Sequence, residues 1–407
     1  MPRRRTPDPT IGERIRVRRL LARLSIRQAA DHAGISHTTW SRIERGAIGA
    51  DNRFTIAAIA EALQCAVTDL TGQPVAPVDS ASVELHSGVH LTHRALMEAD
   101  LDYPPMTAAP RLERLRAECA LLRDLRVRCE YLAVVRRLPA LLRGLHATAG
   151  DPANTAATRD EALRLLVMVA EDATFVLRFA GHPGVAVSAA DRSWQAAERL
   201  GDPVMLALAG WARAGAVAGF DFYERSYAIA DRAASGLAGQ HNRPAAMELL
   251  GQLHLTCALA LRAIGNADDA SARVREAEQI AASTGETRTL ELMFGPTNIR
   301  YWQVAIECDG GEPGRAVEIA SKTESRLLQV PSRLASFHLD TGRALARLRG
   351  MDREAIRMLV TAERLAPQRV RSSPFAVESA RALLDRARRN AAWPELRGFC
   401  ERVGVPL

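Results

Sequence analysis

The chain has 407 residues, of which 47% are hydrophobic and 25% are charged, a composition typical of a globular protein with more than one folded unit. No run of 18 or more uninterrupted apolar residues is present, and the N-terminus is basic without an apolar segment, so we expect a cytoplasmic protein that does not contact a membrane. The net charge is +7, and residues 1–74 hold 12 arginines against 7 acidic residues. Six cysteines lie far apart without a C-x-x-C pair, which favours reduced thiols over disulfides or zinc.

The first 74 residues predict a set of short helices. Apolar residues recur at helical spacing in a first segment, at Ile11, Ile15, Leu20 and Leu24. Ser25 is placed to cap a second helix over residues 26–33, and Gly34 is suited to the turn that follows. A third helix is expected over residues 37–45, ending before Gly46.

Two more helices complete this segment. A fourth amphipathic helix is predicted by its apolar positions, Phe54, Ile56, Ile59, Ala60 and Leu63, and a short fifth helix covers residues 67–72. We therefore expect a five-helix head over residues 10–74, preceded by a flexible basic arm at residues 1–9.

The run from Leu24 to Gly46 resembles the lambda-repressor-like (XRE) family of helix-turn-helix proteins. It has the small residue of the second helix at Ala30, the turn glycine at Gly34 and the helix end Ile-Glu-Arg-Gly. Ala29 departs from the family, which usually has leucine there. The resemblance implies that Arg19 and Glu44 form an internal ion pair between the first and third helices.

In this family the third helix lies in the major groove of DNA, with its N-terminal residues on the base edges. The resemblance places three residues at bases: His37, Thr38 and Arg42. Arginine suits guanine, threonine suits thymine, and histidine can donate to N7. Five more residues are placed at phosphates: Arg27, Ser36, Thr39, Arg45 and Arg53. For each of these eight residues, the alternative is an ordinary solvated surface.

Residues 75–85 contain proline and small residues and read as a linker, and the remainder, residues 86–407, is helical throughout. A glycine stands five residues before an alanine four times, at Gly181 and Ala186, Gly265 and Ala270, Gly311 and Ala316, and Gly350 and Ala355. Ala228 fits the spacing but lacks the glycine. The last unit resembles the tetratricopeptide repeat, while HEAT-like pairs stay open. The fold class is therefore all-α, a five-helix head followed by a tetratricopeptide-like α-solenoid.

Such a solenoid presents a concave groove lined by the first helix of each pair. The repeat register places ten residues on this inner surface: Glu171, Phe175, Arg178, Arg213, Gln252, Arg262, Asn298, Tyr301, Asp340 and Arg347. The segment Met293–Asn298 interrupts the repeat with glycine and proline, which marks it as a candidate ligand-site feature. The alternative is that these are polar groups on a solvated helix face.

The whole layout resembles actinobacterial XRE regulators with tetratricopeptide-like sensor domains and, more distantly, the peptide-sensing regulators of Gram-positive bacteria. The distant relatives imply a homodimer and an intracellular signalling peptide in the groove. A small-molecule effector is an alternative to the peptide.

Other chemistry has little support in the sequence. His86, His90 and His93 have the spacing of one helix face and could hold zinc, but no fourth ligand is evident. No P-loop, dinucleotide fingerprint or hydrolase motif is present, so we expect a non-enzyme without cofactor or metal.

The leading hypothesis is a transcriptional regulator that binds a double-stranded operator, an inverted repeat, as a dimer and responds to an effector in the groove. The second hypothesis makes the body a constitutive protein-interaction scaffold without a small effector. The third, an enzyme fused to a DNA-binding head, has no catalytic constellation behind it.

Overall fold

The computed structural model describes residues 9–74, 79–105, 110–387 and 394–406, and this part of the chain is helical without a strand. Most of the expected arm (residues 1–8) and the first part of the expected linker (residues 75–78) lie outside the described residues. The head comprises α1 (Ile11–Leu21), α2 (Ile26–His32), α3 (His37–Glu44), α4 (Arg53–Ala62) and α5 (Val67–Thr71). These are the five helices that the sequence predicts.

The body comprises the remaining helices, which are listed here in chain order: α6 (Ser80–Glu98), α7 (Leu112–Val127), α8 (Tyr131–Gly150), α9 (Ala156–Phe179), α10 (Pro183–Leu200), α11 (Pro203–Val217), α12 (Tyr223–Ser235), α13 (Pro244–Ala263), α14 (Ala267–Thr284), α15 (Pro296–Asp309), α16 (Pro313–Ser321), α17 (Pro331–Arg347), α18 (Asp352–Leu365), α19 (Pro367–Arg371), α20 (Pro374–Ala387) and α21 (Pro394–Arg402). Short 3₁₀ turns follow α11 and α16, at Ala218–Phe220 and Ser325–Leu327.

The head helices begin where the sequence supplies a capping side chain. The Ser25 hydroxyl accepts a hydrogen bond from the backbone N–H of Gln28, and the Gln28 side chain accepts one from the backbone N–H of Ser25. A similar capping box starts α1. Gly34 follows α2 with a φ of 64°, a left-handed conformation that glycine adopts without strain. One expectation is wrong: Leu20 is 55% exposed, because α1 turns Arg19 rather than Leu20 towards the core.

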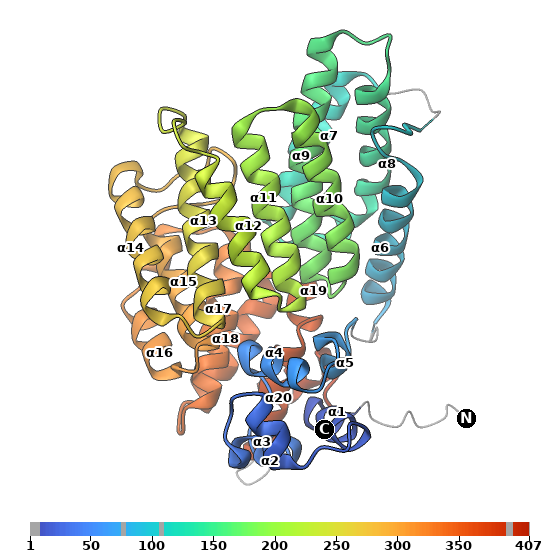
Figure 1. Cartoon of the computed structure of the whole chain (residues 1–407). Helices are drawn as coiled ribbons and strands as arrows, with labels where there is room; N and C mark the ends of the chain where they lie inside the picture. The colour runs from blue at the N-terminus through green and yellow to red at the C-terminus, as the bar shows by residue number, and fades with distance from the viewer. Residues whose placement is uncertain (1–8, 75–78, 106–109, 388–393, 407) are drawn as a thin grey trace, which may run out of the picture.

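The body is built from consecutive helix pairs, which stand side by side in Figure 1. Four pairs (α9 with α10, α13 with α14, α15 with α16, and α17 with α18) turn through a glycine with positive φ, and the alanine five residues later is buried where the helices cross. The predicted register is confirmed at these four turns: Gly181, Gly265, Gly311 and Gly350. The chain is an all-α protein in which the head precedes a tetratricopeptide-like solenoid.

The pair α11 and α12 corrects the prediction. Ala228 is exposed and is not the crossing residue of this pair. The left-handed turn residue is Asp221, with a φ of 63°, and the side chain five residues later is Ser226, which is buried. Aspartate tolerates this backbone conformation better than most residues, so the unit keeps its geometry without the glycine.

The linker prediction also changes. Residues 80–85 belong to α6, which Asp79 caps by accepting a hydrogen bond from the backbone N–H of Ser82 at 2.7 Å.

The segment Pro203–Phe220 is apolar and long enough to cross a membrane by length and composition, but 67% of it is buried, as in the core helix of a globular protein. The main hydrophobic cluster joins α6 to α13. The head lies below the lower ends of the helix pairs, with α4 and α5 towards the body (Figure 1).

Candidate nucleic-acid interface and effector pocket

Helix α3 presents one face to the head core and the other to solvent. Ser36 caps it by accepting a hydrogen bond from the backbone N–H of Thr39 at 3.0 Å. Trp40 and Ile43 are buried and fix the inner face. The proposed base-contacting residues, His37, Thr38 and Arg42, are exposed. The described body residues therefore leave the expected DNA-reading surface open.

A buried polar cluster holds α3 against α1. Arg19 Nε and Nη2 donate to the two carboxylate oxygens of Glu44 at 2.6 Å and 2.9 Å. Trp40 Nε1 donates to the same carboxylate at 2.6 Å. The ion pair implied by the family resemblance is thus confirmed. Because all three side chains are buried and paired, the recognition helix has a defined orientation within the head.

Four of the five proposed phosphate contacts lie near this face. Arg27, Ser36 and Arg45 are exposed, and Thr39 is half-buried with its hydroxyl 2.9 Å from that of Ser36. The structure corrects the prediction for Arg53. Its guanidinium turns towards the body, where it forms ion pairs, so the phosphate role is not supported for it in this arrangement.

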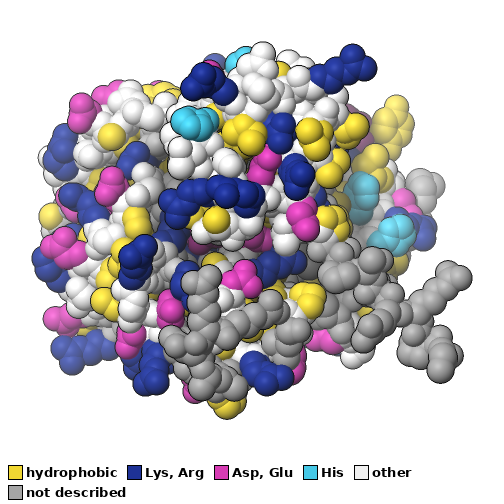
Figure 2. Space-filling view, turned by 90° about the horizontal axis from the view of Figure 1, so that it is seen from below, with side chains coloured by type: hydrophobic (Ala, Val, Ile, Leu, Met, Phe, Trp, Pro, Cys, Tyr) yellow, Lys and Arg dark blue, Asp and Glu magenta, His cyan; other side chains and the backbone are white. Residues whose placement is uncertain are grey.

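The underside of the molecule is mixed in charge. Figure 2 shows Lys and Arg side chains over this face with Asp and Glu side chains between them, and the grey atoms cover part of it. The basic side chains visible on this face are therefore interspersed with acidic ones rather than forming one continuous basic surface.

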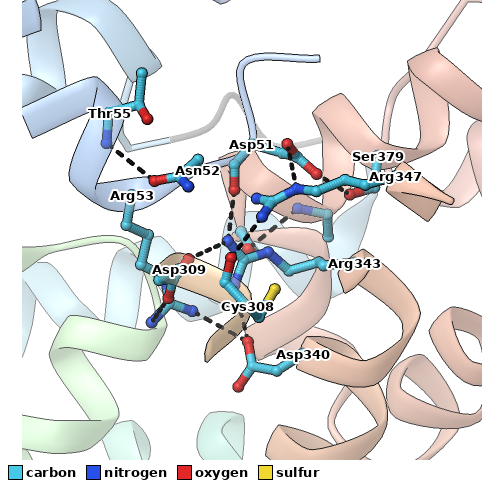
Figure 3. A network of polar contacts seen from close by, with 12 residues as sticks. Asp51, Asn52, Arg53, Thr55, Cys308, Asp309, Asp340, Arg343, Arg347 and Ser379 are labelled. Carbon is cyan, nitrogen blue, oxygen red and sulfur yellow. Dashed lines mark hydrogen bonds and ion pairs between the residues drawn. The ribbon is translucent and has the colours of Figure 1, made fainter. Parts of the chain in front are cut away.

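The head is tied to the body through the segment before α4, as Figure 3 shows. The backbone carbonyl of Asp51 accepts a hydrogen bond from Arg343, and its side chain accepts bonds from Arg347 at 3.0 Å and Ser379 at 3.2 Å. Arg343 also donates to Asp309 at 2.6 Å and to Asp340 at 2.8 Å. We call Asp51, Asp309, Asp340, Arg343, Arg347 and Ser379 the joint.

Arg53 adds a second head residue to this connection. Its guanidinium lies 3.5 Å from an oxygen of Asp309 and 3.6 Å from an oxygen of Asp340. Burial alone would raise the pKa of Asp309, but Arg343, Arg53 and Arg347 together hold that pKa below its ordinary value. Phe54 packs edge-on against Tyr223 at 5.3 Å, so apolar contact accompanies the charges.

A cavity of about 140 Å³ opens on the inner surface of the solenoid and shares Asp340 with the joint. It is lined by the first helices of the five pairs, as the repeat register predicts. Five of the ten expected groove residues line it: Phe175, Arg178, Asn298, Tyr301 and Asp340. We call this cavity the inner pocket.

The other five expected residues do not line the inner pocket. Glu171 and Gln252 are fully buried beside the pocket, where Gln252 donates to the Leu292 carbonyl at 2.7 Å. Arg213 lies in another groove, paired with Asp191, and is not part of the inner pocket. Arg262 donates to the Gly310 carbonyl at 2.9 Å, and Arg347 belongs to the joint.

The main feature missed from the sequence is the number of arginines around the inner pocket. Arg53, Arg126, Arg333 and Arg369 line it together with Arg178. They come from α4, α7, α17, α19 and α9, and four of them lay outside the expected groove list. Their convergence depends on tertiary packing of distant segments, and no local spacing in the sequence reports it.

The segment Met293–Asn298 does reach this site. Gly295 and Pro296 start α15 and place Asn298 on the pocket wall, 1% exposed. Its Nδ2 has no hydrogen-bond partner among the described residues. An unpaired buried amide is costly, so a ligand acceptor at this position would relieve that cost.

The alternative metal site finds no support in the geometry. His86 packs against His182 at 4.9 Å, while His90 and His93 are exposed. No group of three or more metal-binding side chains occurs within the described ranges. All six cysteines are free, five of them buried, and burial raises the pKa of Cys119 to about 12, which makes that thiol unreactive.

Comparison with known proteins identifies the head. Residues 10–71 match the family model of a helix-turn-helix domain. No curated protein matches the chain. A crystal structure of Bacillus thuringiensis PlcR in complex with the peptide PapR7 and DNA is similar at 14% identity over 68% of this chain and 95% of that chain, with a TM-score of 0.27. That TM-score is too low to establish a shared arrangement.

Proposed function

We propose that this protein is a sequence-specific DNA-binding transcriptional regulator of the XRE type whose helical body responds to an effector. The observation that carries the first part is the helix-turn-helix match over residues 10–71 together with an exposed α3. His37, Thr38 and Arg42 read bases, and the remaining exposed polar residues around α3 contact phosphates. The regulator acts in the cytoplasm as a homodimer on an inverted repeat.

Effector response is supported by the position of the inner pocket. It lies in the body, yet Arg53 of the head forms part of its wall, and Asp340 belongs to both the pocket and the joint. A ligand that binds one arrangement of head and body better than another shifts the balance between them. The expected coupling is about 1–3 kcal/mol, which changes operator affinity in the same measure as ligand affinity.

The test is selection of bound sequences from random duplex DNA by the full chain at physiological salt. Enrichment of an inverted repeat supports a dimeric, sequence-reading regulator. The matched control replaces the three proposed base contacts together, as His37→Ala, Thr38→Ala and Arg42→Ala, and should abolish enrichment while the fold persists. Failure of the unaltered protein to enrich any sequence contradicts specific readout.

The scaffold hypothesis makes a different prediction. If the body only recruits a partner protein, no small compound should stabilise the full chain against heat, because stabilisation requires binding to the folded state. Saturable stabilisation by a small compound, lost on substitution of a residue lining the inner pocket, favours the effector-responsive regulator.

A further inference from the structure

The lining of the inner pocket holds more arginines than carboxylates. Five arginines line it against one carboxylate, Asp340. Arg126 is paired with Asp172, and Arg53 with Asp309 and Asp340. Across the described part of the chain, no carboxylate forms an ion pair with Arg178, Arg333 or Arg369. None of these three cations therefore has a carboxylate in direct contact, and only the more distant carboxylates of Asp221 and Glu171 act favourably on the charges of Arg178 and Arg333.

The direct contacts that protein groups make with Arg333 and Arg369 are weak. Arg333 donates to the Leu292 carbonyl at 2.7 Å, but its Nε has no partner within the described chain. Arg369 donates to the Ser332 carbonyl at 3.5 Å and lies over the Phe179 ring at 3.9 Å. Cation–π contacts and single carbonyl bonds stabilise a guanidinium less than a paired carboxylate does.

The arginines also act on one another. Burial, with Arg53 and Arg369 nearby, lowers the pKa of Arg178 to about 10, and burial with Arg126 and Arg369 nearby lowers that of Arg333 to about 10. Arg369 acts on both Arg178 and Arg333. Each remains charged at neutral pH, so the folded protein holds a repulsive cluster that an anion would relieve.

Much of the remaining lining is apolar or aromatic, and the cavity has the size of one ring. Phe175 and Trp211 lie 4.5 Å apart on its wall, and Trp302 lines it as well. The cavity of about 140 Å³ is close to the roughly 150 Å³ cavity that accepts benzene in an engineered protein. Asn298, with its unpaired buried amide, adds a hydrogen-bond donor to the wall.

We propose that the inner pocket binds a ligand with a carboxylate or phosphate group on a ring-sized apolar body, and that Arg53 makes this anion site common to head and body. The inference deepens the proposed function, since it names the chemistry of the effector and the residue that carries its signal. The anion lies among Arg53, Arg178 and Arg369 and holds α4 against the solenoid. It binds the docked head in preference to a released one.

A second cavity supports the placement of this anion at the head. It is lined by α5, the start of α20 and the carboxylate of Asp221, and it shares Arg53, Arg178 and Arg369 with the inner pocket. The three arginines thus stand between the solenoid interior and the crevice next to the head. A ligand that reaches them from the inner pocket touches the head directly.

The experiment measures binding of benzoate and phenyl phosphate to the full chain without DNA, by calorimetry and thermal shift, with benzamide as the neutral analogue. We expect saturable binding of at least one anion and none of benzamide in the same range. Arg178→Gln and Arg369→Gln should each weaken binding roughly 10-fold to 100-fold, the effect of losing a charge-assisted hydrogen bond. The matched control Arg275→Gln removes an exposed arginine of α14 and should bind as the unaltered protein does.

Stability of the ligand-free variants separates a binding arginine from a structural one. Arg178→Gln should unfold at the same or a higher temperature than the unaltered protein, because it removes repulsion rather than a pair. Binding of benzoate alone assigns a carboxylate, and binding of phenyl phosphate alone assigns a phosphate. Equal binding of benzamide, binding of neither anion, or equal loss in Arg275→Gln overturns the anion site.

Arg53→Gln tests the head's part in the site. Weakened anion binding in this variant supports a site made by head and body together, and unchanged binding overturns that part while leaving the body arginines in place. Because no DNA is present, these results stand apart from operator selection. A protein that binds the anion but selects no operator would contradict the proposed function alone.

Discussion

The head has an outward face and an inward face, and different parts of the chain hold them in place. On the outward face, α3 exposes Arg42 and is fixed by Arg19 and Glu44 within the same short domain. On the inward face, Asp51 is held by Arg343, which lies 292 positions later. The reading surface therefore depends on a local motif, whereas its orientation on the body depends on contacts between distant segments.

The largest expected effect comes from removing the central arginine of the joint on the inward face. Arg343→Met should lower the free energy of unfolding by about 3–5 kcal/mol, because it leaves the carboxylates of Asp309 and Asp340 buried with less compensation. Urea unfolding of the full chain measures the loss. The base preference found by DNA selection should stay the same, since α3 is not touched.

Arg349→Met is the matched control for this change. It makes the same substitution at an exposed position just after α17, and its stability should lie within about 0.5 kcal/mol of the unaltered protein. Equal stability of the Arg343→Met variant would show that the joint contributes nothing to the fold.

This contrast explains which features of the head can be predicted from the sequence. The caps at Ser25 and Ser36 and the turn at Gly34 lie within the segments that they shape, so the head helices were predictable from local chemistry. The sequence places Arg53 at a phosphate because its sequence neighbours are head residues. Its partners Asp309 and Asp340 lie in the body, beyond any local pattern.

The body shows the same division. Its repeat register was readable at glycine turns and failed at Asp221, where another residue adopts the same backbone conformation. The register found half of the expected pocket residues because it identifies the first helix of each pair. It missed Arg126 and Arg369, which come from α7 and α19, outside the five helix pairs.

The outward face is tested by Arg42→Ala. We expect specific DNA affinity to fall by about 1–3 kcal/mol, with relaxed preference at one base position, because a bidentate contact to a base is lost. Competition binding with operator variants measures both effects, and thermal stability should not change. Arg16→Ala, an exposed arginine on α1, is the control. A uniform loss across all sequences would make Arg42 a phosphate contact instead.

A buried carboxylate in the body makes its stability depend on pH. Burial and the neighbouring Asp172 raise the pKa of Glu171 to about 7. In the unfolded chain this group ionises near its ordinary pKa of about 4.5, so its stabilising contribution is present at low pH and lost as pH rises through about 7. Glu171→Gln should flatten the fall in stability between about pH 5 and 7 by up to about 1 kcal/mol per pH unit.

Urea midpoints at several pH values measure this slope. Glu198→Gln, an exposed carboxylate on α10, should keep the slope of the unaltered protein. The assignment of Glu171 is contradicted if its removal leaves the pH dependence unchanged.

The smallest expected effect tests whether the turns of the repeat require glycine, the residue that reveals the repeat in the sequence. Gly311 and Gly314 lie three residues apart, and a Cβ atom at either would meet nothing within 4 Å. They differ in backbone, since Gly311 has a φ of +87° and Gly314 lies in the first turn of α16. Gly311→Ala should therefore cost about 1 kcal/mol through strain alone, while Gly314→Ala should be neutral or stabilising by up to about 1 kcal/mol. Thermal unfolding of both variants measures the difference. Equal effects would mean that the left-handed turn does not require glycine at this position of the repeat.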